Sequence, residues 1–156
     1  VALRRALAVH SMSALTVVAI RQRVEAALVG TSGLTRSRFS SELFGMDARL
    51  LMHGAFAVGA PLTEAHPTTQ RQQRNEGVLS NTTIEVRLAG NHRADAQVAD
   101  VDALLALEGT TIKAVEGIAR TDLHIVFASA ARELSTEFEF VLSTISFRII
   151  HRLALE

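Results

Sequence analysis

The sequence contains no cysteine, no tryptophan and no tyrosine, and phenylalanine supplies its only large aromatic side chains, seven in number. The absence of cysteine excludes disulfides, thiolate metal sites and cysteine nucleophiles, and it favours a reducing compartment. Surfaces that stack sugars or single-stranded bases need several aromatic faces, so the composition disfavours both kinds of surface. No apolar run approaches the roughly 20 residues needed to cross a bilayer. We therefore expect a cytoplasmic protein without a membrane partner.

Lysine is nearly absent as well, because Lys113 is the only lysine among 16 basic residues. Residues 1–80 carry nine arginines against five acids, and residues 81–156 carry seven basic residues against eleven acids. This split of +4 and −4 either indicates a polyanionic partner such as nucleic acid on the basic side or reflects chance and solubility. With 48% hydrophobic and 21% charged residues, the chain of 156 residues predicts a buried core.

The first half of the chain predicts helices joined by turn-rich links. Residues 2–29 contain few helix breakers and show partial helical spacing of leucine and valine. Residues 30–41 are rich in glycine and serine and predict a connection. We expect a further helix to begin with Asp47 as its N-cap. Residues 59–67 then predict a second link.

From Ser80 onward, the hydrophobic pattern predicts a sheet with two helices. In chain order, the expected elements are a strand at 82–90, a helix at 93–109, strands at 110–120 and 122–129, a helix at 131–143 and a strand at 145–155. This order is that of the split βαβ, or ferredoxin-like, unit. Right-handed crossovers would place both helices on one face and leave an apolar sheet face that requires a partner.

The sequence thus predicts an α+β protein with two parts. Residues 1–79 form an N-terminal helical, helix-turn-helix-like region, and residues 80–156 form a ferredoxin-like βαββαβ domain for oligomerisation and effector binding.

In the helix expected at 93–109, Gly109 is the predicted end. Its apolar face is predicted to contain Val98, Val101 and Leu105, and its solvated face to contain Asp95, Asp100, Asp102 and Glu108.

The stretch "HPTTQRQQRNEGVLS", residues 66 to 80, has no aliphatic residue until its last three positions. Pro67 suits the first turn of a helix, and Gly77 suits its end. Arginine pairs with phosphates and glutamine with adenine edges, so such a helix can lie in the major groove of double-stranded DNA. The alternative is a polar surface loop. The predicted DNA-binding residues are Thr68, Thr69, Gln70, Arg71, Gln73 and Arg74.

The six histidines are scattered, and no set of histidine and acidic residues has metal-ligand spacing. His124 and His151 fall on expected strands, with Asp122 nearby, which allows an acid/base pair. The simpler interpretation is that both histidines face solvent or a subunit boundary. The sequence also contains no glycine-rich phosphate loop and no nucleophile elbow. We therefore predict no catalytic residue, no metal and no cofactor.

Several segments resemble one family. "DARLL" with "APLTEAHPTTQRQQRNEGVL" looks like a first helix and a recognition helix, "TTIEVRL" like a first regulatory strand, and "ARTDLHIVFAS" through "FRIIHRLAL" like the second half of a regulatory domain. On these segments, residues 47–156 resemble the leucine-responsive/asparagine-regulator (Lrp/AsnC) family of bacterial transcription factors. The resemblance implies a homodimer or higher homo-oligomer. It also implies a small effector, such as an amino acid, bound near Arg120, Thr121 and Asp122.

The chain departs from this family in places. Only two helices fit between Asp47 and Gly77 where the family uses three, and Ala119 stands where glycine is usual. "SELFGMDARLL" also resembles the family's link into the first regulatory strand, which would make residues 1–34 the DNA-binding part, and both registers stay open. A shorter segment, "DLHIVFASAAREL", resembles the trimeric chorismate mutase of bacilli.

Three functional hypotheses follow from the sequence. The first is a DNA-binding transcriptional regulator that responds to a small metabolite. The second is a small oligomeric α+β enzyme or ligand-binding protein, with its pocket at a subunit interface and Arg120, Asp122 or His124 as polar anchors. The third is an assembly module whose sheet provides its functional surface.

Overall fold

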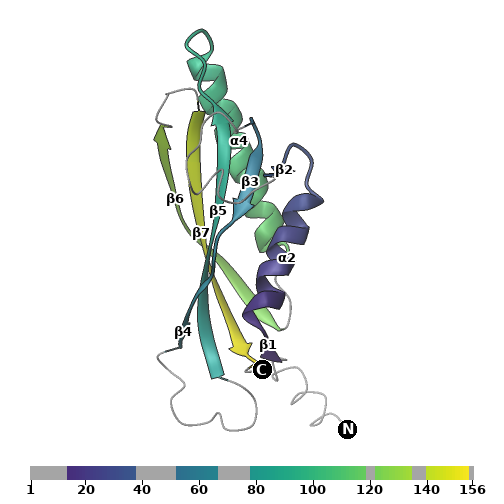
Figure 1. Ribbon diagram of the computed structural model, residues 1–156. Helices are drawn as coiled ribbons and strands as arrows, with labels where there is room; N and C mark the ends of the chain where they lie inside the picture. Colours follow the sequence, from purple (N-terminus) through teal and green to yellow (C-terminus); the bar gives the residue numbers. More distant parts are fainter. Residues whose placement is uncertain (1–13, 38–51, 67–77, 119–121, 135–139, 155–156) are drawn as a thin grey trace, which may run out of the picture.

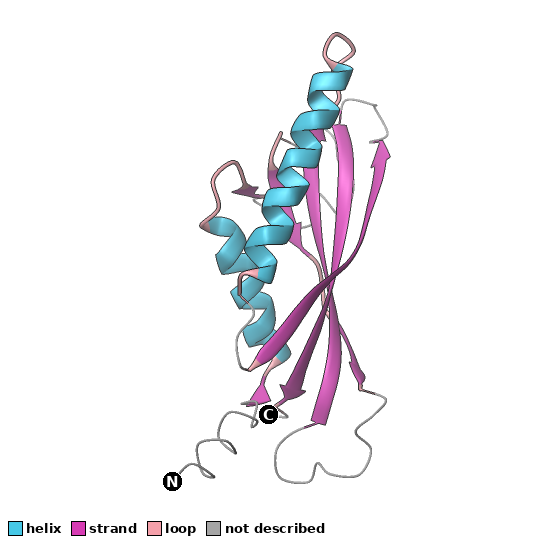
Figure 2. Cartoon of the chain, turned by 180° about the vertical axis from the view of Figure 1, so that it is seen from behind, coloured by secondary structure: helices cyan, strands magenta, loops and turns pink. Residues whose placement is uncertain are grey.

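A computed structural model describes residues 14–37, 52–66, 78–118, 122–134 and 140–154. Within these residues, a curled sheet of seven strands carries two helices on one face, as Figure 1 and Figure 2 show from opposite sides. The elements follow in the order β1 (Ala14–Leu15), α2 (Val17–Val29), β2 (Thr35–Arg36), β3 (Ala55–Val58), β4 (Leu62–Ala65), β5 (Val78–Asn91), α4 (Gln97–Glu116), β6 (Leu123–Leu134) and β7 (Phe140–Leu153).

Two long strands, β5 and β7, form the centre of the sheet. They pair antiparallel over 14 residues each, from Val78 opposite Leu153 to Asn91 opposite Phe140. β6 pairs antiparallel with the other edge of β7, and both β3 and β4 pair antiparallel with the other edge of β5. β1 and β2 add short parallel pairings to β7 and β3. The helix α4 therefore connects two parallel strands, β5 and β6, that have β7 between them.

The core lies between the helices and the sheet face that they cover. On β5, Ile84, Val86 and Leu88 are fully buried and alternate with half-buried polar residues, as expected for a strand with one face in a core. β7 contributes Ile145, Phe147 and Ile149 to the same cluster. Each such side chain contributes roughly 1.5–3 kcal/mol to folding when fully buried. One core therefore includes side chains from α2, α4 and the central strands.

The helix α2 shows why this part of the sequence is helical. The hydroxyl of Thr16 accepts a hydrogen bond from the N–H of Ala19 at 3.1 Å, which satisfies a first-turn donor. The buried stripe has a four-residue spacing and consists of Ile20, Val24 and Leu28. The helix expected within residues 2–29 is confirmed for Val17–Val29. Residues 1–13 and the predicted N-cap Asp47 lie outside the described residues.

Two glycines allow close approach of neighbouring segments. Gly54 has a φ of 82°, and a Cβ atom there would lie 2.4 Å from the carbonyl oxygen of Gly33. Gly90 of β5 faces α4, where a Cβ atom would lie 2.9 Å from Cδ1 of Leu104. A side chain at Gly54 would be strained by its backbone angle, and one at Gly90 would push the helix from the sheet.

The predicted helix-turn-helix-like region followed by a ferredoxin-like βαββαβ domain is wrong. The described part of the first half contains one helix, with β1 before it and three strands after it, because β3 and β4 form where the sequence predicted a helix and a link. β3 places Phe56 and Val58 in the core and Ala55 and Ala57 on the opposite face. A short apolar run satisfies either structure, and here pairing with β5 decides in favour of the strand.

In the second half of the chain, the structure differs from the sequence-based expectation at two of the six expected elements. The strand expected at 82–90 is confirmed within β5, and those expected at 122–129 and 145–155 are confirmed from Leu123 in β6 and as far as Leu153 in β7. The helix expected at 93–109 is confirmed from Gln97, where α4 begins. The strand expected at 110–120 is wrong, because α4 continues to Glu116. The helix expected at 131–143 is also wrong, because β6 extends to Leu134 and β7 begins at Phe140.

The helix α4 passes through Gly109 because its buried stripe continues beyond that residue. Thr111, which favours strands, donates its hydroxyl hydrogen bond to the carbonyl of Leu107 at 2.8 Å and is fully buried. Val115 then completes the stripe, and the amide of Gly117 donates to the carbonyl of Lys113 at the end of the helix. Its neighbour Thr110 donates in the same way to the carbonyl of Ala106 at 3.0 Å, so hydrogen bonds inside the helix accommodate both threonines.

The predicted faces of α4 are also wrong. Val98, Val101 and Leu105 are exposed. The buried stripe instead consists of Asp100, Leu104, Glu108, Thr111 and Val115. Two acids lie in that stripe because each is paired with an arginine. Neither of the two described helices is both long and apolar enough to span a bilayer.

Candidate functional site

Most of the predicted site residues lie outside the described part of the chain. The six predicted DNA-binding residues Thr68, Thr69, Gln70, Arg71, Gln73 and Arg74 lie outside the described residues, as do Arg120 and Thr121. Asp122 is described, and its Oδ2 atom lies 2.9 Å from Nη2 of Arg23 on α2. This ion pair joins the helix to the beginning of β6.

The face of the sheet that lies away from the helices has a polar part and a second, buried apolar cluster that consists of Ala55, Ala57, Ala89 and Leu142. Because Ile84 and Val86 face the core, their neighbours Glu85 and Arg87 face the other side. Cross-strand pairs on that face join Arg87 with Thr144, Glu85 with Ser146 and Thr83 with Arg148. The expectation of a bare apolar face is therefore wrong for the described residues, because polar side chains line the middle of this face and its apolar cluster is buried.

The free edge of β6 is the more unusual surface. β6 pairs with β7 over most of its 12 residues, and the described part of the chain provides no strand on its other side. Nine of these 12 residues are exposed, among them Val126 and Leu134, whose exposure is 44% each. An unpaired edge of this length presents a row of backbone donors and acceptors to which another strand can pair.

Two local features modify this edge. The register of β6 against β7 shifts between Phe127 and Ser129, which indicates a β-bulge. The amide of Phe127 donates a hydrogen bond to Oε1 of Glu116 at 3.2 Å. Because this amide bonds to a side chain of α4, it points away from β7 and toward the free edge. The carboxylate of Glu116 therefore occupies one donor of the edge.

A hydrogen-bonded chain of three side chains, of which Thr82 and His151 are fully buried, connects β4, β5 and β7. The hydroxyl oxygen of Thr82 lies 2.9 Å from that of Thr63 and 2.6 Å from Nε2 of His151. Nδ1 of His151 lies 3.2 Å from the carbonyl oxygen of Arg152, which can only accept a hydrogen bond. Nδ1 therefore carries the proton, so that Thr82 donates to Nε2 and accepts from Thr63.

The interpretation that His151 faces solvent or a subunit boundary is wrong, whereas His124 is exposed as expected. Burial lowers the pKa of His151 by disfavouring the charged imidazolium, although the hydrogen bond to Arg152 opposes this change. In the pairing of β6 with β7, Leu123 lies opposite His151 and faces the core, and His124 faces the other side. The structure therefore does not bring the two histidines together as an acid/base pair.

A second buried cluster joins α4 to β6 and β7. Oε1 of Glu108 accepts hydrogen bonds from Nε of Arg132 and Oγ of Ser143, each at 2.6 Å, and Oε2 accepts one from Nη2 of Arg132. The carboxylate is nearly inaccessible, so its charge needs these donors. Hydrogen bonding to Glu108 raises the pKa of Arg132. The arrangement stabilises the helix on the sheet.

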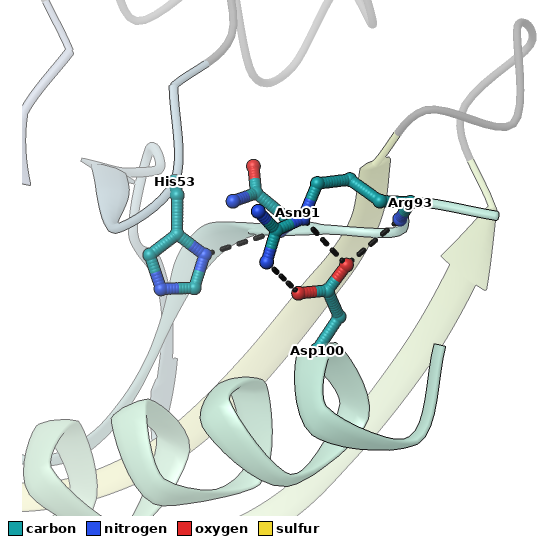
Figure 3. A network of polar contacts seen from close by, with 4 residues as sticks. All are labelled: His53, Asn91, Arg93 and Asp100. Atoms are coloured by element: carbon teal, nitrogen blue, oxygen red, sulfur yellow. Dashed lines mark hydrogen bonds and ion pairs between the residues drawn. The ribbon is translucent and has the colours of Figure 1, made fainter. Parts of the chain in front are cut away.

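A third polar network lies at the beginning of α4, where Figure 3 shows four residues. Oδ2 of Asp100 accepts from the amide and Nε of Arg93 at 2.8 Å and 3.2 Å, and Oδ1 accepts from Nη2 at 2.7 Å. The side-chain hydrogen bonds from Arg93 lower the pKa of Asp100 to about 2. Beside this network, the backbone N–H of Asn91 donates a hydrogen bond to Nδ1 of His53 at 3.1 Å.

These clusters are satisfied by donors from the chain itself. Within the described ranges, no group of three or more histidine, aspartate or glutamate side chains could hold a metal ion. Sequence reasoning missed both buried acids of α4, although a signal was present. Asp100, Leu104 and Glu108 recur at four-residue spacing, which places them on one helical face.

The sequence matches no protein-family model and no curated protein. The fold that the Lrp/AsnC resemblance implied is not the observed fold. What that resemblance implied for DNA and effector binding stays a prediction.

Proposed function

We propose that this protein is a binding domain that forms homo-oligomers through the free edge of β6. A small-molecule ligand of this protein would bind at the boundary between subunits. The observation that carries this proposal is the length of exposed β6 edge that no strand of the described residues covers. Strand addition at such an edge gains affinity from main-chain hydrogen bonds and specificity from alternate side chains. The opposite face of the sheet shows polar pairs and a buried apolar cluster, so the edge provides the more specific reason to associate.

The proposal places the association surface at the edge of the sheet that β6 forms. The other long strands, β5 and β7, have neighbours on both edges, and β1 and β2 contain two residues each. The exposed side chains of Val126 and Leu134 add apolar area beside the backbone groups of β6. A cytoplasmic location belongs to the proposal, since a chain without cysteine suits a reducing compartment.

Light scattering of the full chain over a range of concentrations tests the proposal with two matched variants. Val126→Glu places a carboxylate opposite Arg148 in the folded sheet, so the fold tolerates it, but it adds a charge to the association surface. Val98→Glu makes the same change in the first turn of α4, where an acid is favourable.

The wild-type chain and Val98→Glu should assemble alike, and Val126→Glu should need at least about tenfold more protein, which corresponds to about 1.4 kcal/mol. A wild-type chain that stays monomeric at every concentration contradicts the proposal. Equal assembly of both variants contradicts the role of the β6 edge.

Binding of double-stranded DNA by the polar segment at 68–74 stays a prediction of the sequence. Its support is the arginine and glutamine content of that segment and the positive charge of residues 1–80. A mobility-shift assay at low salt should show retention that weakens steeply as salt rises, because phosphate contacts release counterions. The double variant R71A/R74A should lose retention, and a wild-type chain that never retards duplex DNA removes the hypothesis.

A further inference from the structure

The bulge in β6 exchanges the two faces of the strand along its length. Before the bulge, Leu123 and Ile125 face the core, so the odd-numbered residues lie on the helix side. After the bulge, Ala130 packs against the core and Arg132 reaches Glu108, so the even-numbered residues lie on the helix side. The two halves of β6 therefore have opposite side-chain parity.

This parity decides how β6 can pair with another β6. In an antiparallel pair, residues opposite one another must lie on the same face, since a slip by one residue moves every side chain to the wrong face. When Leu123 lies opposite Leu134 of the second strand, each pair joins one residue before the bulge to one residue after it. Because the faces exchange at the bulge, the two residues of every pair then lie on the same face of the sheet, and all 12 residues of the strand take part in the pairing.

We propose that the strand added to β6 is the β6 of a second copy of this chain, antiparallel and in this end-to-end register, with both bulges on the twofold axis. The inference rests on the proposed function and specifies its partner. On the helix side, the opposing pairs are Leu123 with Leu134, Ile125 with Arg132 and Phe127 with Ala130. On the other side, the pairs are His124 with Glu133 and Val126 with Ala131.

Side-chain chemistry distinguishes this register from its neighbours. His124 meets Glu133 of the second copy twice, once on each side of the axis, which pairs a hydrogen-bond donor or cation with a carboxylate. A shift by two residues in one direction would place Asp122 opposite Glu133, so that two acids meet. A shift in the other direction would place Val126 opposite Glu133. Both changes replace the complementary pair, and the first adds like-charge repulsion.

The backbone also fits the end-to-end register. The Phe127 amide points to the free edge, and in an antiparallel ladder the amides of Ile125 and Leu123 point the same way. These residues therefore form the hydrogen-bonded pairs of the new ladder, and His124 and Val126 form the closer, non-hydrogen-bonded pairs. The Phe127 amide would exchange Glu116 for the carbonyl of Ala130 of the second copy. A lone bulge discourages pairing, but two bulges on the axis preserve the match of faces.

Disulfide cross-linking tests the register, because the chain contains no cysteine of its own. In the double variant H124C/E133C, each new cysteine faces its counterpart on the second copy at a separation that a disulfide can span. Within one chain the two positions lie about 30 Å apart along an extended strand, so an internal disulfide cannot form. The offset control is H124C/A131C, and a second matched pair is V126C/A131C.

After mild oxidation of the assembled full chain, non-reducing electrophoresis should show mainly covalent dimer for H124C/E133C and V126C/A131C. The offset control should give at least about fivefold less dimer, and each single cysteine variant should behave like the control, because no residue faces itself. Thermal melts of the reduced variants confirm that each is folded. Equal cross-linking in the offset control, or none in either matched pair, overturns the register. Light scattering separates the two failures: assembly without these cross-links removes the register alone, and a monomeric chain removes the proposed function as well.

Discussion

Nε2 of His151 lies 2.6 Å from the hydroxyl oxygen of Thr82, and both side chains are fully buried. The hydrogen bond crosses from β7 to β5, and Thr63 of β4 extends it by a further contact of 2.9 Å. An imidazole in this position is an acceptor at Nε2 and must stay neutral. Protonation would replace the accepted hydrogen bond by a second donor facing Thr82.

Stability should therefore fall as the pH falls below about 6.5, the ordinary pKa of histidine. Burial lowers the pKa of His151 in the folded state, so between the two pKa values the unfolded chain binds a proton that the folded chain does not. The loss begins near the unfolded pKa and ends at the lowered folded pKa, with a slope of at most about 1.4 kcal/mol per pH unit. Urea unfolding at pH 5 and pH 7.5 measures it.

The variant for this prediction is His151→Asn, which removes the buried imidazole and should flatten the pH dependence of stability. If His151→Asn does not fold, the ring resonances of His151 in the wild-type chain still report its titration by NMR. An ordinary titration near pH 6.5 would contradict the prediction.

Removing the hydroxyl of Thr82 should destabilise the fold. Thr82→Val preserves the shape but leaves Nε2 of His151 without a donor and Thr63 without its partner. Unpaired buried polar groups cost about 1–3 kcal/mol each, so urea denaturation should show a loss of that size. Thr82→Ser should recover most of it. Thr83→Val, on the opposite face of β5, is the control, and equal losses for both valine variants would argue against the hydrogen-bonded chain.

Hydrophobic periodicity predicts part of this fold and not the rest. Alternation of Ile84, Val86 and Leu88 identifies β5, because one face of that strand lies in the core. The segment at 131–143 satisfies a helical spacing equally well, and only pairing with β7 and the contact of Arg132 with Glu108 make residues 131–134 part of a strand. Local pattern does not contain such long-range partners, so the sequence alone leaves the choice undecided.

The candidate site was harder to predict than the elements. The strand at 122–129 is recognisable from Leu123, Ile125 and Phe127, but its place at the edge of the sheet depends on which strands β7 pairs with. The bulge after Phe127 has no sequence signal of its own, since Ala128 and Ser129 suit many conformations. Asp122, for which the resemblance implied a place near an effector, pairs with Arg23. That partner lies on a helix about 100 positions away in the chain and could not be paired from spacing.

The ion pair between Asp100 and Arg93 should stabilise the fold at pH values above the ordinary pKa of aspartate. Because Arg93 lowers the pKa of Asp100 from 3.8 to about 2, the folded state holds the charged form more firmly than the unfolded state. The contribution is present above pH 3.8 and is lost as the pH falls toward 2. The difference in unfolding free energy between wild type and Asp100→Asn should therefore shrink over this range. Asp102→Asn, an exposed acid of the same helix, should show no such change.

Glu116 should limit the addition of a second strand at the β6 edge. Its carboxylate occupies the Phe127 amide, so Glu116→Ala frees a donor for a second strand. The variant should assemble at several-fold lower protein concentration than wild type in light scattering. The fold should not suffer, because an acid in the last turn of a helix is unfavourable toward the helix dipole. Glu64→Ala, an exposed acid of β4, is the control. Weaker assembly of Glu116→Ala would show that Glu116 supports association rather than limits it.

Truncation of Arg132 should cost more than truncation of a neighbouring arginine on the same sheet. Arg132→Ala leaves the buried carboxylate of Glu108 with Ser143 as its remaining side-chain donor. Breaking a fully buried ion pair costs several kcal/mol, but the guanidinium here is partly exposed, so we expect about 1–3 kcal/mol in urea denaturation. Arg148→Ala, on the exposed face of β7, should change stability by less than about 0.5 kcal/mol. In a double-mutant cycle with Glu108→Gln, the cost of Arg132→Ala should largely disappear, since the neutral amide tolerates the loss of the arginine. An unchanged cost in that background would mean that Arg132 stabilises the sheet by packing and not through the charge of Glu108.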